Sequence, residues 1–148
     1  MIRRLIAAAA LTLFAFCGHD ARDPVRETVN RVAAAAESRD AGAVGTYLSA
    51  GFRDADGGTK ADAADLLRRT LGAYASISLA LSDVTVESAP QAARATFRVG
   101  MSGKPRAVSG LEGLLPRTSA WRFELRLELE KGSWKITSAS WRRLEESG

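Results

Sequence analysis

A strictly alternating stretch near the C-terminus constrains the fold of this 148-residue chain more than any other feature. From Trp121 to Glu130 every second residue is apolar, and the residues between are arginine or glutamate. This period of two is typical of a strand with one buried and one solvated face. A second strand-like run follows at 133–142, so Lys131-Gly132 predicts a hairpin with a two-residue turn. Because a half-buried strand needs partners and a cover, we expect further strands and helices packed on them.

The part of the chain before this hairpin predicts helices first and strands afterwards. A brief strand is expected at 52–53, and residues 77–86 and 93–101 alternate, with a phase shift at Ser82-Asp83 that predicts a β-bulge. The stretch 102–118 is irregular and either extends a strand or forms a functional loop. The order predicts an α+β fold, a curved and mostly antiparallel sheet packed against about three N-terminal helices. The helical segments begin after capping residues and carry apolar side chains at helical spacing: 24–39, 40–50 and 60–75.

The N-terminus has the pattern of a secretion signal. Arg3 and Arg4 precede an apolar run, residues 5–16, which is too short to cross a bilayer. Cys17, the single cysteine, follows directly, which favours a bacterial lipoprotein with a lipid on this residue. The alternative is a soluble exported protein cleaved nearby. In both cases we expect the protein on the periplasmic side of the cell envelope, without an internal disulfide.

These patterns divide the chain into four parts. The hydrophobic share of 46% and the charged share of 26% fit one globular domain of ordinary size. The expected parts are a signal segment at 1–17, a tether at 18–22, a folded domain at 23–143 and a tail at 144–148.

Charge and composition exclude several kinds of function. The net charge of +4 includes Arg3 and Arg4 of the signal segment, so the folded part is too weakly basic to bind nucleic acid by bulk charge. The single histidine, His19, lies in the expected tether, which excludes a Ser-His-Asp, Cys-His or histidine-based metal site in the domain. Neither a phosphate-binding glycine loop nor a dinucleotide motif is present, and we expect no cofactor and no metal.

Three short segments resemble members of the nuclear transport factor 2-like superfamily, which includes ketosteroid isomerases and SnoaL-like proteins. They are Pro24–Val29, Tyr47–Asp54 and Gly132–Ile136. With the order of elements, the resemblance covers about residues 24–142. It implies a cystatin-like cone with a pocket between helices and sheet, and often a dimer. It does not imply one activity, since the superfamily includes several kinds of enzyme and members without known catalysis.

One acidic residue is a catalytic candidate through this resemblance. Asp54 resembles in its place the general-base aspartate of ketosteroid isomerases. The resemblance also implies a tyrosine and a neutral carboxylic acid that hold an oxyanion. Glu124 falls near the place of that acid but alternates with apolar neighbours, and the first helix has no tyrosine. We therefore interpret Asp54 as a turn residue in an Asp/Gly-rich bend, with catalysis as the alternative.

The hairpin register predicts a pocket. Continued without interruption from the turn, it sets Leu125 opposite Ser138 and Phe123 opposite Ser140. Small hydroxyl residues on a face that packs helices would leave room for an apolar ligand, unless a helix side chain fills the gap. The expected lining comes from two helical tyrosines and five strand residues: Tyr47, Tyr74, Trp121, Phe123, Leu125, Ser138 and Ser140.

The opposite strand face is expected to be charged. Its arginines alternate with glutamates, which is typical of a solvated face, although a homodimer surface is an alternative. These arginines are Arg94, Arg98, Arg122 and Arg126.

Together these patterns predict an exported, membrane-anchored domain that binds a small apolar molecule or a partner, without catalysis. Its membrane contact is expected through the N-terminal lipid or signal segment alone. One alternative is an isomerase or dehydratase that uses Asp54, and another is a structural envelope module that acts through its sheet face.

Overall fold

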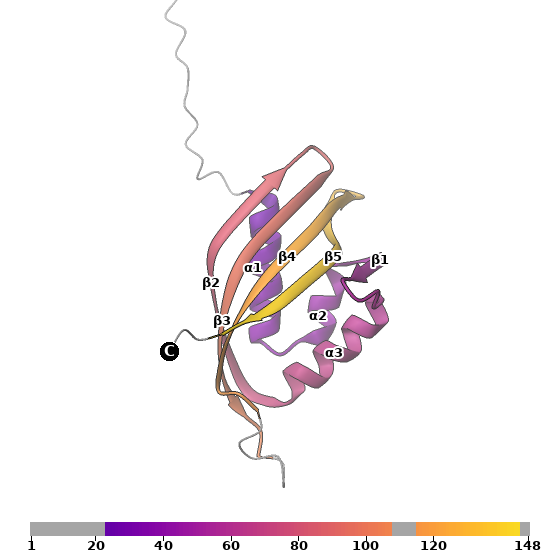
Figure 1. Cartoon of the computed structure of the whole chain (residues 1–148). Coiled ribbons are helices and arrows are strands. Elements are labelled where there is room, and N and C mark those ends of the chain that lie inside the picture. Colours follow the sequence, from indigo (N-terminus) through magenta and orange to yellow (C-terminus); the bar gives the residue numbers. More distant parts are fainter. Residues whose placement is uncertain (1–22, 108–114, 146–148) are drawn as a thin grey trace, which may run out of the picture.

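Five strands and three helices form a curved α+β fold, in a computed structural model that describes residues 23–107 and 115–145 (Figure 1). The expected signal segment and Cys17 lie outside these residues. In chain order the elements are α1 (Pro24–Glu37), α2 (Ala41–Thr46), β1 (Leu48–Asp54), α3 (Lys60–Gly72), β2 (Tyr74–Ser88), β3 (Ala92–Pro105), β4 (Thr118–Glu130) and β5 (Ser133–Leu144).

The strands form one mixed sheet in the order β1-β5-β4-β3-β2. The short edge strand β1 is parallel to β5, and all other neighbours are antiparallel. Figure 1 shows α1 behind the long strands, while α2 and α3 lie beside β1. The sequence-based expectation of a curved, mostly antiparallel sheet with three helices on its apolar face is confirmed.

Capping residues start the helices where the sequence predicts. The Asp23 carboxylate accepts a hydrogen bond from the Val25 amide at 2.9 Å, and Pro24 occupies the first helical position. Thr59 and Asp62 form a reciprocal capping box at the start of α3. The hydrogen bonds from Thr59 lower the pKa of Asp62, since they stabilise its ionised form.

The ends of two helices differ from the expectation. Helix α2 stops at Thr46, and Tyr47 caps it. Residues from Leu48 onward form β1, because the amide of Ile136 on β5 donates to the Tyr47 carbonyl at 2.8 Å and strand pairing continues from there. Likewise α3 ends at Gly72, and Tyr74 is the first residue of β2. Neither tyrosine therefore belongs to a helix.

Two irregular positions in the sheet match the sequence pattern. The turn at Lys131-Gly132 has positive φ at both residues, 48° and 80°, as a type I′ hairpin requires. In β2 the register shifts between Ser82 and Thr85, and Asp83 has a φ of 51°. The bulge predicted at Ser82-Asp83 is confirmed.

The register of β4 and β5 is correct near the turn and wrong beyond it. Leu127 lies opposite Ile136, as expected, but a bulge follows at Thr137. Leu125 then lies opposite Ala139, and Phe123 lies opposite Trp141, not Ser138 and Ser140. The extra residue moves every later side chain of β5 to the other face of the sheet.

The irregular stretch at 102–118 turns out to be partly strand. Strand β3 continues to Pro105, and β4 begins at Thr118. Residues 108–114 lie outside the described part of the chain.

The main core lies between α1, β1 and the helix-facing side of the sheet. It includes Val25 and Val29 of α1, Phe52 of β1 and Leu127 of β4. Ala95 of β3 is completely buried within it. Over residues 23–107 and 115–145, no helix is long and apolar enough to cross a membrane.

Candidate functional site

Three stacked aromatic rings form the most distinctive feature of the helix-facing side of the sheet. Phe97 of β3 stacks on Phe123 of β4 with ring centroids 5.6 Å apart and an interplanar angle of 5°. Phe123 in turn stacks on Trp141 of β5 at 6.2 Å and 27°. We call Phe97, Phe123 and Trp141 the aromatic ladder.

The ladder runs from the core to the solvent. Phe97 is buried and Phe123 is half-buried, whereas Trp141 is 38% exposed. The neighbouring strand β1 has its last pairing at Asp54, opposite Ala139, so it does not flank Trp141. A large apolar ring thus remains accessible at the edge of an otherwise packed aromatic surface, which is suited to contact with an apolar molecule.

The residues of the predicted pocket do not line one common surface. Phe123 and Leu125 face the helices, and Leu125 belongs to the main core, against which Tyr47 also packs. Ser138 and Ser140 lie opposite Arg126 and Glu124, on the other face of the sheet. Their expected place beside Phe123 was wrong because of the bulge at Thr137.

Tyr74 and Trp121 are also held by local contacts. Tyr74 belongs to a second apolar cluster with Leu71 and Ile77, and its hydroxyl donates to the Pro116 carbonyl at 2.9 Å. Burial raises the pKa of Tyr74, since the charged phenolate is poorly solvated there. The Trp121 indole Nε1 donates to the buried Ser119 hydroxyl at 2.9 Å.

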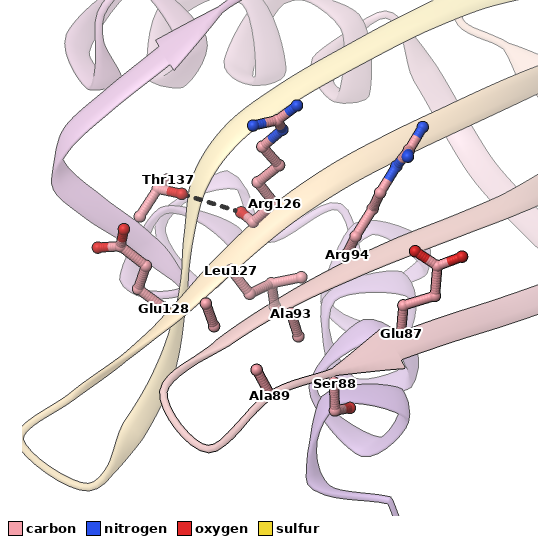
Figure 2. Close-up of a pocket in the computed structure, with 10 residues that line it drawn as sticks. Glu87, Ser88, Ala89, Ala93, Arg94, Arg126, Leu127, Glu128 and Thr137 are labelled. Carbon is pink, nitrogen blue, oxygen red and sulfur yellow. Dashed lines mark hydrogen bonds between the residues drawn. The ribbon is translucent and has the colours of Figure 1, made fainter.

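A surface hollow lies elsewhere, near the ends of the two hairpins (Figure 2). It has a volume of about 480 Å³ and is open to solvent. Outward side chains of β2, β3 and β4 surround it, among them Glu87, Arg94, Arg126 and Glu128. It is a charged surface groove rather than an apolar ligand cavity.

Asp54 forms the bend after β1. Its carboxylate Oδ1 accepts hydrogen bonds from the amides of Asp56 at 2.9 Å and Gly58 at 2.8 Å. The Asp54 amide donates back to the Gly58 carbonyl at 2.9 Å. These contacts support the interpretation of Asp54 as a turn residue.

Substitution of Asp54 tests its hydrogen-bonding role in the turn, as distinct from a catalytic role. Asp54→Asn keeps the oxygen that accepts both amides, so we expect little change in the free energy of unfolding. Asp54→Ala removes it and is expected to cost about 1–2 kcal/mol, the usual loss for such a local acceptor. Urea unfolding of both variants measures this difference. Equal losses of unfolding free energy in Asp54→Asn and Asp54→Ala would contradict the hydrogen-bonding role.

Comparison with known proteins places the fold but not the activity. No protein-family model and no curated protein matches the sequence. Among solved structures, Bd1075 of Bdellovibrio bacteriovorus matches 83% of this chain with a TM-score of 0.68 and 12% identity, and the chain spans 40% of that protein's length. A candidate scytalone dehydratase of Novosphingobium aromaticivorans matches 82% of this chain and 83% of its own, with a TM-score of 0.69 and 10% identity.

A third structure carries the name of the fold. It is a nuclear transport factor 2-like superfamily protein of Salmonella enterica, with a TM-score of 0.67 and 17% identity over 84% of this chain and 91% of its own. The chain therefore has the nuclear transport factor 2-like fold, as the sequence resemblance implied. Proteins with this fold include ligand-binding members, dehydratases and isomerases, so the fold alone does not define an activity.

Proposed function

We propose that this chain is an exported, membrane-anchored domain that binds a small apolar molecule on the helix-facing side of its sheet, without catalysis. The observation that carries the binding proposal is the aromatic ladder with its exposed end at Trp141. Export and anchoring rest on the apolar run at 5–16 and on Cys17.

The ladder fits an apolar ligand for two reasons. First, an offset-stacked aromatic pair gains about 0.5–1.5 kcal/mol beyond the free energy of burying its surface. Trp141 stacks on one neighbour, Phe123, and the exposed part of its ring can stack on a ligand. Second, Phe97 and Phe123 are held in place by their stacking, so the binding surface would already be ordered before a ligand arrives.

Removal of Trp141 tests the proposed site. We expect Trp141→Ala to weaken the binding of an uncharged apolar dye, N-phenylnaphthylamine, by roughly tenfold, because the ladder loses its accessible ring. Fluorescence titration of the dye measures this change. Leu129→Ala is the matched control, since Leu129 is 37% exposed but lies at the hairpin end of β4. Equal dye affinity in wild type and Trp141→Ala would contradict the proposal.

The second candidate function is a dehydratase or isomerase with Asp54 as general base. It draws on the fold shared with the candidate scytalone dehydratase and on the half-buried position of Asp54. Loss of such an activity in Asp54→Asn, with unchanged unfolding, would favour this function over the non-catalytic one.

A further inference from the structure

Five arginines gather on the outer face of the sheet, which is turned away from the helices. Arg98, Arg122 and Arg142 lie directly opposite one another on β3, β4 and β5. Arg94 and Arg126 form a second row on β3 and β4, and Figure 2 shows both extending in the same direction. Given the usual strand geometry, the first row spans roughly 10 Å and the two rows are roughly 13 Å apart. We call these five residues the arginine face.

The carboxylates of this face lie mainly around the second row, so the first row is the more strongly basic part. Glu124 lies between the two rows, where Arg94 donates to it at 2.9 Å. That hydrogen bond, and the charges of Arg94, Arg126 and Arg122, hold the pKa of Glu124 below its usual range. Arg98 has Asp83 at 3.7 Å, at the edge of the sheet. Glu87 lies opposite Arg94 in the second row, and Glu128 lies two residues beyond Arg126; both line the hollow.

The two rows of arginines lower the stability of the free domain. Like charges directly opposite each other destabilise an antiparallel pair, and here two such pairs follow in one row. Departures from a local rule of this kind are typical of functional surfaces, where stability is given up for binding. The arrangement points to an anionic partner.

We propose that the arginine face docks the domain on the phosphate headgroups of an anionic membrane. The aromatic residues of the three central strands all lie on the helix-facing side, so the described outer face offers no stacking platform for single-stranded nucleic acid. A five-stranded sheet is also too broad for a groove of duplex DNA. Charge complementarity therefore favours a bilayer surface.

This inference rests on the membrane attachment proposed above. A chain attached at Cys17 would reach the first described residue through residues 18–22, a distance of at most roughly 20 Å. Such a short tether raises the effective concentration of the domain at the bilayer.

Flotation of the full chain with vesicles tests the docking. One set of vesicles is phosphatidylcholine alone, and the other is equal parts phosphatidylcholine and phosphatidylglycerol. We expect tighter binding to the anionic set and a loss of about a hundredfold in the triple variant R98Q/R122Q/R142Q, since each basic residue near such a surface contributes about fivefold. The triple variant R98K/R122K/R142K should keep the tighter binding, and high salt should remove it.

A matched variant distinguishes the effect of the arginine face from the effect of lowering the net charge. R31Q/R68Q/R69Q removes three exposed arginines from α1 and α3 and should behave as wild type. Equal losses in the two glutamine variants, or no loss in R98Q/R122Q/R142Q, would overturn the proposal. A dimer in sedimentation that only R98Q/R122Q/R142Q dissociates, or an oligonucleotide affinity that only this variant loses, would assign the face to another partner and overturn it too. Binding to neutral vesicles reports the N-terminal attachment separately, so failure of the anchor and failure of the face are distinguishable.

Discussion

Replacement of Leu127 by alanine is expected to lower the free energy of unfolding by about 2–5 kcal/mol, a large share of the 5–15 kcal/mol of an ordinary domain. Leu127 is 1% exposed and lies in the core between α1 and the sheet. The loss has two parts. One is the transfer free energy of the removed atoms, and the other is the free-energy cost of the cavity that the packed neighbours leave unfilled.

Leu129 provides a matched control on the same strand and the same face. It lies two residues further along β4 and is 37% exposed. Leu129→Ala should therefore cost less than about 1 kcal/mol, because little packing is lost at the surface. Urea unfolding of both variants measures the difference. Similar losses would contradict the placement of the core.

Replacement of Ala139 by aspartate is expected to be the second severe change, with a loss of about 3 kcal/mol or more. Ala139 is 9% exposed and lies opposite Leu125, so the new carboxylate would enter the apolar core without a partner. Ser138→Asp is the control at the adjacent position. There the carboxylate would lie opposite Arg126 on the outer face, so stability should be unchanged or slightly higher.

This pair of variants tests the bulge at Thr137 directly. Thermal unfolding at neutral pH should give a low midpoint for Ala139→Asp and a nearly normal one for Ser138→Asp. The opposite order would restore the uninterrupted register, with Ser138 beside the helices, and would refute the aromatic ladder as described.

The sequence contained the sign of this bulge. Its apolar positions change phase within β5, from Trp134 and Ile136 to Ala139 and Trp141. A shift of the same kind at Ser82-Asp83 predicted the bulge in β2 correctly. In β5 the small residues Ser138 and Ser140 fit either face, so alternation alone did not decide the register. Stacking of Trp141 on Phe123 shows which face the chain takes.

The helix ends could not be predicted for a different reason. Tyr47 and Tyr74 continue the apolar spacing of the preceding helices in sequence, but both join strands. Their hydrogen-bond partners lie far away in the chain, with Ile136 for the Tyr47 carbonyl and Pro116 for the Tyr74 hydroxyl. Local periodicity contains no information on such contacts. By contrast, capping signals at Asp23 and Thr59 are local and predicted the helix starts correctly.

Native mass spectrometry tests the central claim most directly. The full chain would be purified in mild detergent from the membranes of its own host, together with Trp141→Ala and Leu129→Ala. We expect wild type and Leu129→Ala to retain a small noncovalent apolar molecule and Trp141→Ala to lose it. Wild type without any such molecule, or Trp141→Ala with the same occupancy as wild type, would contradict ligand binding at the aromatic ladder.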